Sequence, residues 1–198
     1  MAEIKSTLDL VMERAARMGT ATSGELRSAD AHTRGRQMAA EYLDRKSEAL
    51  AGLLNEQQPE LQPAIRKGMI ETLLRNIVLP RSEEAIERIN RALAGLLDLG
   101  GHGGDISAIG REIQHILGQY LQHREQLREQ LESQIRMQYE QLLAQQSGMR
   151  NEGLRIDPTM QPKFQEEWSR IQAELDGQYN QALMQHRQVL AQRLALPA

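Results

Sequence analysis

Residues 105–146 decide the fold: DISAIGREIQHILGQYLQHREQLREQLESQIRMQYEQLLAQQ. Apolar side chains recur in this stretch every three or four residues, as at Ile106, Ile109, Ile113, Ile116 and Tyr120. That spacing places them on one face of an α-helix. With a rise of about 1.5 Å per residue, such a helix is roughly 60 Å long.

A second stretch with the same spacing predicts another long helix over residues 160–196. Pro162 suits the first helical position, and the segment from Ser147 to Pro162 interrupts the two patterns. We therefore expect an antiparallel hairpin with an aromatic cluster at its closed end. A short connection would set its register, which pairs Phe164 with Leu143, Trp168 with Tyr139, Leu175 with Leu131, Leu190 with Leu117 and His123 with His186.

Three or four shorter helices are expected before the hairpin. The patterns predict them over residues 3–18, from about residue 28 or 30 to 58, over 61–78, and from Ser82 to about 99. Ser82 and Asp105 are the expected N-caps of the last short helix and the first long one. Leu, Ala, Gln, Glu and Arg dominate the chain, and aromatic residues make up 3% of it, so the predicted class is all-α.

The glycine-rich run from Leu99 to Asp105 is the expected boundary between two parts of the chain. Residues 1–104 would form a short-helix docking or dimerisation head, and residues 105–198 would form the long helical hairpin. The short helices offer a modest core, so we expect them to lean on the hairpin or on a second copy of the chain.

Charge and composition exclude several classes of partner and site. The net charge is −3, with 14 basic and 15 acidic side chains in residues 1–104 and 10 and 12 in the remainder, so no basic footprint for nucleic acid is expected. The chain has no cysteine, which excludes disulfides and thiolate sites. No apolar run suits membrane insertion, and the first residues do not resemble a secretory signal. A cytoplasmic location is the expectation.

Glutamine is concentrated in the predicted hairpin, with 18 residues in 105–198 against 4 in 1–104. Gln126, Gln130 and Gln134 belong to a row that recurs every four residues beside the apolar stripe. This row is a candidate surface for a partner helix, because amides form hydrogen bonds without charge. The alternative is a solvated flank, since glutamine is a good helix former. A second candidate is the apolar face of residues 3–18, formed by Ile4, Leu8, Val11 and Met12.

One motif suggests metal chemistry. Glu112 and His115 have the Glu-x-x-His spacing of di-iron helical bundles, but such sites need a second pair and two further glutamates. No second pair occurs, and no nucleophile motif or phosphate loop is present. We therefore predict no catalytic, cofactor or metal site.

Taken together, these patterns predict a non-enzymatic helical scaffold that presents a rigid hairpin to protein partners and forms homo-oligomers, with coiled-coil-like packing. Three alternatives remain open at this level. They are a holdase-like chaperone or secretion-associated helper, a stalk-like subunit of a larger machine, and a metal-binding helical-bundle enzyme built on Glu112 and His115.

Overall fold

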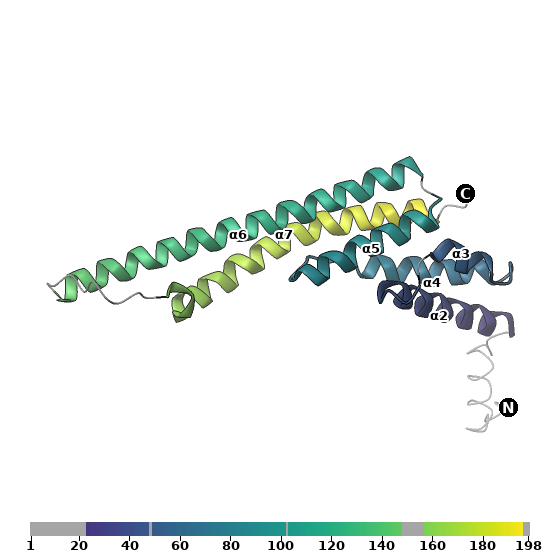
Figure 1. Cartoon of the computed structure of the whole chain (residues 1–198), viewed down its shortest axis with the longest axis horizontal. Coiled ribbons are helices and arrows are strands. Elements are labelled where there is room, and N and C mark those ends of the chain that lie inside the picture. The colour runs from purple at the N-terminus through teal and green to yellow at the C-terminus, as the bar shows by residue number, and fades with distance from the viewer. Residues whose placement is uncertain (1–22, 48, 102, 148–156, 196–198) are drawn as a thin grey trace, which may run out of the picture. The chain divides into compact units, whose positions relative to one another are not determined.

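The computed structural model describes residues 23–47, 49–101, 103–147 and 157–195. All the regular structure within these ranges is helical, which confirms the all-α prediction. The chain divides into two compact units, residues 1–72 and residues 73–198. The division falls inside α4 (Gln62–Arg75). The predicted helix over residues 3–18 lies outside the described residues. Figure 1 labels the elements.

The first unit contains α2 (Ser23–Leu43), α3 (Leu50–Asn55) and most of α4. One continuous helix from about residue 30 to 58 was a wrong prediction, because α2 ends at Leu43. Arg45 takes a left-handed backbone conformation with φ 62°, and the Lys46 amide donates to the Glu41 carbonyl at 2.9 Å. This is the hydrogen-bond pattern that closes many helices, usually with glycine at the left-handed position.

Two glycines let α2 and α4 cross closely. A Cβ atom on Gly35 would overlap the backbone carbonyl of Ile65, and one on Gly68 would overlap the carbonyl of His32. Only a residue without a side chain fits at either position. Beside this crossing, His32 Nε2 and Glu71 Oε2 are 3.1 Å apart. Ala39, Tyr42, Ile65 and Met69 are buried in the same helices.

The second unit contains α5 (Glu83–Leu99), α6 (Gly104–Ser147), the 3₁₀ turn η1 (Pro158–Met160) and α7 (Pro162–Ala195). The bounds of α6 and α7 lie within two residues of the predicted ones. Ser82 caps α5 as predicted, because its side chain accepts from the Ala85 amide at 3.3 Å.

Asp105 is not the N-cap of α6, because that helix already begins at Gly104. Its carboxylate accepts from the adjacent Ile106 amide at 2.9 Å and lies 3.7 Å from Arg193 near the end of α7. Glycine at 103 and 104 lets the helix begin before the first residue with a capping side chain. The aspartate therefore joins the open ends of the two long helices instead.

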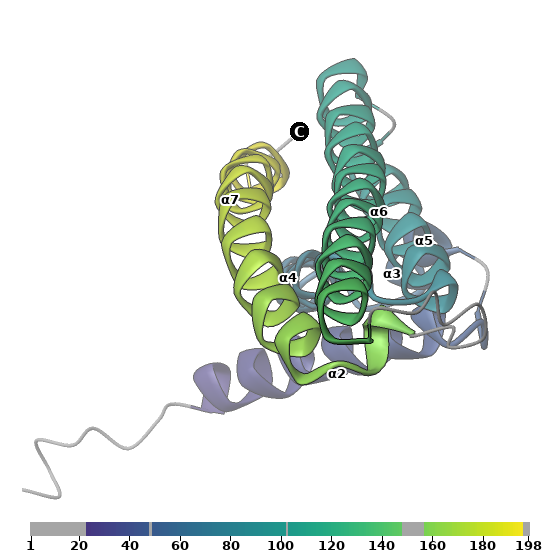
Figure 2. The same cartoon turned by 90° about the vertical axis from the view of Figure 1, so that its left-hand side faces the viewer.

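Helices α6 and α7 pack along each other, and α5 lies against α6. Figure 2 looks along the hairpin from its closed end and shows α6 between α5 and α7. The packed stripes are apolar and buried, which supplies most of the stabilisation of this unit. Because α5 packs in the same compact unit as the hairpin, the division between the two units falls before residue 104. The predicted roles of residues 1–104 as a docking or dimerisation head and of residues 105–198 as the presented hairpin stay predictions. The buried stripe comprises Ile106, Ile113, Leu117, Tyr120, Leu131 and Ile135 of α6 and Phe164, Leu175, Leu183, Leu190 and Leu194 of α7.

Candidate interaction surface

A polar and aromatic contact joins the two long helices near their middle. The Tyr120 hydroxyl donates to Asp176 Oδ1 at 2.8 Å. The Tyr120 ring meets the Tyr179 ring edge-on at 5.4 Å between centroids, and the His123 ring also meets the Tyr179 ring edge-on, at 6.2 Å between centroids. Edge-on ring pairs are favourable beyond their buried area. These contacts fix which levels of α6 and α7 face each other.

Burial is the main reason that the pKa of Tyr120 rises to about 12. The hydrogen bond to Asp176 and the negative charge of that carboxylate raise it further, while the positive charges of Arg124 and Arg81 oppose the rise. The phenol therefore stays protonated at neutral pH and acts as a permanent donor. A proton-transfer role at neutral pH is not suited to such a group.

The observed register differs from the predicted one by about two helical turns. Tyr179 was expected near residue 128 of α6, but it meets Tyr120 and His123. His123 therefore does not pair with His186. At the closed end, Lys163 Nζ donates to Gln138 Oε1 at 2.7 Å. The first turn of α7 therefore lies beside residue 138 of α6, and the last residues of α6 extend beyond the start of α7. The prediction assumed that a short connection joins the two helices directly. In the structure, η1 packs against both α6 and α7, so part of the connection runs back beside α6 before α7 begins.

The predicted aromatic cluster forms with different neighbours. Phe164 is buried with Leu131 and Ile135, and Trp168, Ile171 and Tyr139 pack around them. The Phe164 and Trp168 rings stack at 6.5 Å between centroids. The two-turn shift places Phe164 beside residues 131–135 instead of Leu143.

The exposed surface of the hairpin changes character at the level of Tyr120. Toward the closed end, residues 124–140 and 163–176 hold five basic and eight acidic side chains. Toward the open end, residues 113–123 and 177–192 expose no Asp, Glu, Lys or Arg side chain. Arg187 is the one such residue in these ranges, and it is half-buried, which lowers the pKa of its guanidinium.

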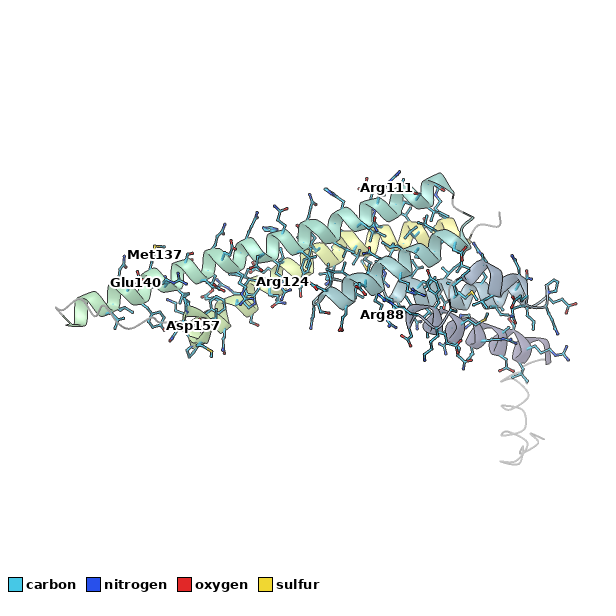
Figure 3. All side chains as sticks on the ribbon, in the orientation of Figure 1. Arg88, Arg111, Arg124, Met137, Glu140 and Asp157 are labelled. Atoms are coloured by element: carbon cyan, nitrogen blue, oxygen red, sulfur yellow. The ribbon has the colours of Figure 1, made fainter. Side chains whose placement is uncertain are left out.

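We call the exposed side chains of these two ranges the uncharged band. Because Tyr120 meets Tyr179, its two parts lie beside one another on the hairpin. Arg111 and Arg124, labelled in Figure 3, lie on α6 just outside the band. The side chains that face solvent are amides, small residues and a few apolar groups. They are Gln114, His115, Gly118, Gln119, Gln122 and His123 of α6 and Gly177, Gln178, Asn180, Gln181, Met184, Gln185, Gln188, Val189 and Gln192 of α7.

The predicted partner residues Gln126, Gln130 and Gln134 are all exposed on α6. They continue the amide row of the band into the charged half, where Arg128 and Glu132 form a salt bridge beside them at 3.1 Å. The other predicted partner residues, Ile4, Leu8, Val11 and Met12, lie outside the described residues. The more informative signal is the loss of charge over residues 113–123 and 177–192, which the glutamine row alone does not reveal.

Other features of the described residues offer little chemistry. Glu112 and His115 are both exposed on α6, and the described ranges hold no group of three His, Cys, Asp or Glu that could bind a metal ion. None of the helices described is long and apolar enough to cross a membrane.

An open hollow of about 400 Å³ lies between α7 and the segment that leads into α5. Val78, Leu79, Arg81, Ala85, Asp176 and Asn180 line it. Its walls combine apolar groups with one carboxylate and one guanidinium, without a buried polar group that is free to bind a ligand. The uncharged band is therefore the stronger candidate site.

Comparison with known proteins adds a family. Residues 51–192 match the model of DUF6657, a family of unknown function. The chain belongs to this family. No curated protein and no solved structure matches it. The part that matches DUF6657 includes both ranges of the uncharged band, so the band belongs to the portion of the chain that the family model covers.

Proposed function

We propose that this DUF6657 protein is a non-enzymatic helical interaction protein that presents its hairpin to protein partners and self-associates. The observation that supports the proposal is the uncharged band. In a chain with 26% charged residues, 27 hairpin residues expose no charged side chain. The cores of protein interfaces are similarly depleted of charge and enriched in methionine.

The composition of the band favours a protein as its ligand. Glutamine amides both donate and accept hydrogen bonds, so they match the polar groups of another helix without requiring an opposite charge. A nucleic acid or an anionic membrane surface would instead favour clustered lysine and arginine. Met184 is 61% exposed and Val189 is 40% exposed. A bound protein would remove the apolar surface of both side chains from water, which favours binding.

The rigidity of the hairpin suits presentation of such a surface. Buried apolar residues continue from Ile106 to Ile135 on α6 and from Phe164 to Leu194 on α7, so the band stands on two packed helices. A surface held in this way loses little conformational freedom on binding. A cytoplasmic location stays a prediction from the sequence.

Hydrogen exchange at low and high protein concentration tests the proposal. Self-association through the band should slow amide exchange in residues 113–123 and 177–192 as the concentration rises. Residues 124–140 serve as an internal control, and their exchange should change little. Equal exchange at all concentrations would contradict self-association, and slowing confined to 124–140 would place the surface elsewhere.

A further inference from the structure

The uncharged band contains a seam that the fold leaves open. On α7, Gln178, Ala182, Gln185, Val189 and Gln192 alternate in steps of four and three residues. This is the spacing that a helix presents to a second helix in a coiled coil. Ala182 is half-buried and the other four residues are exposed, so the packing of α5, α6 and α7 within the second unit leaves this seam uncovered.

A matching seam runs along α6. Ile109, Glu112, Ile116, Gln119 and His123 alternate in steps of three and four, with both isoleucines half-buried and the other three residues exposed. His123 contacts Tyr179, which places this seam next to the one on α7. Asp176 and Asn180 line the hollow. Helical spacing places them about 140–180° around α7 from Gln178 and Gln185, on the opposite side of the helix. The two seams therefore adjoin on one face of the hairpin, on the side away from the hollow, and we call this pair of seams the groove.

We propose that this groove is occupied by the same groove of a second copy of the chain, with the two hairpins antiparallel. This inference rests on the proposed function and names its partner. The chemistry of the groove is self-complementary, because rows of amides can donate to and accept from identical rows. Glu112, at one end of the groove, is its only formally charged member. A strongly charged partner would have to bury charges opposite groups that cannot neutralise them.

Charge in the other half of the hairpin decides the orientation. Residues 124–140 and 163–176 together carry a net charge of −3, from five basic and eight acidic side chains. Parallel hairpins would place two such regions side by side. A two-fold axis perpendicular to the hairpins sends them to opposite ends, so that like charges stay apart.

The observed register locates this axis. Since Tyr120 meets both Tyr179 and Asp176, Ile116 and Ala182 lie at nearly the same level along the hairpin. They are also near the middle of the groove. A two-fold axis at this level would place Ala182 next to its counterpart in the second copy.

Distance measurement between spin labels tests the arrangement, and the absence of cysteine gives a clean background. Ser169 is exposed on the charged half of α7, thirteen residues from Ala182. With a label on Ser169→Cys of the full chain, antiparallel hairpins predict a distance of about 40 Å between copies. Parallel hairpins would instead bring the labels to one level, within about 25 Å given helix spacings of roughly 10 Å.

A second variant checks the axis itself. Ala182→Cys should form a disulfide between two copies under mild oxidation, whereas Ser133→Cys, exposed in the charged half of α6, should not. A dimer with a short Ser169 label distance would overturn the antiparallel groove but leave the proposed function standing. A third outcome is that the spin labels show no distance between copies while the amides of the uncharged band exchange equally at every protein concentration. That result would contradict both the dimer through the groove and the proposed self-association.

Discussion

The Tyr120 hydroxyl and the Asp176 carboxylate, 2.8 Å apart, connect α6 to α7 at the level where the charged half of the hairpin gives way to the uncharged band. Tyr120 is 1% exposed, so its hydroxyl is held close to a half-buried acceptor. The contact sets the register of the two long helices and thereby brings the two parts of the band together.

Removing this hydroxyl should weaken the hairpin. Tyr120→Phe keeps the ring against Tyr179 but leaves the Asp176 carboxylate without its donor, and such a loss costs about 1–3 kcal/mol. Urea unfolding followed by circular dichroism measures the change. Tyr179→Phe is the matched control, because its hydroxyl makes no hydrogen bond to the described residues. Equal stability of the Tyr120→Phe variant and the parent would show that the contact does not hold the helices together.

Alkaline pH should act on the same residue. The pKa of Tyr120 in the folded chain is about 12, above its ordinary value of about 10, so folding favours the protonated phenol. The resulting stabilisation is complete below pH 10 and disappears as the pH rises from 10 to 12. Ultraviolet titration should detect one of the four tyrosines ionising near pH 12. Tyr120→Phe should remove that late step, and its persistence in the variant would assign the step to another tyrosine.

The α2–α4 crossing should not tolerate a methyl group. Gly35→Ala and Gly68→Ala each place a Cβ atom on a backbone carbonyl of the opposite helix, and separating the helices costs about 1–3 kcal/mol. Gly52→Ala is the control, because a Cβ atom there meets nothing within 4 Å and alanine favours the helix by about 1 kcal/mol. Thermal unfolding should therefore move in opposite directions for the two kinds of variant. A stabilising Gly35→Ala change would contradict the close crossing.

Local sequence signals predicted much of the fold. The apolar spacing gave the bounds of α6 and α7, Pro162 marked the start of α7, and Ser82 identified the cap of α5. These features depend on residues close together in the chain, so one sequence is enough to predict them.

The break after Leu43 and the register of the hairpin were not predictable in the same way. Arg45 adopts a conformation that usually signals itself by glycine, and the register depends on how η1 packs across two helices. Both follow from tertiary contacts. Of the candidate surface, the sequence predicted the amide row at Gln126, Gln130 and Gln134. The pairing of two uncharged stretches required knowing that Tyr120 faces Tyr179.

Molar mass by light scattering tests the central claim most directly, namely that the uncharged band binds protein. The parent chain and a control with Gln141→Glu and Gln165→Glu, both toward the closed end of the hairpin, should approach twice the 22.4 kDa chain mass. A variant with Gln178→Glu and Gln185→Glu in the groove should stay near 22.4 kDa at concentrations where the parent chain dimerises. Like charges at the interface repel and should raise the dimer dissociation constant at least ~10-fold. If the parent chain were monomeric, or if the groove and control variants had the same mass, the account would be contradicted.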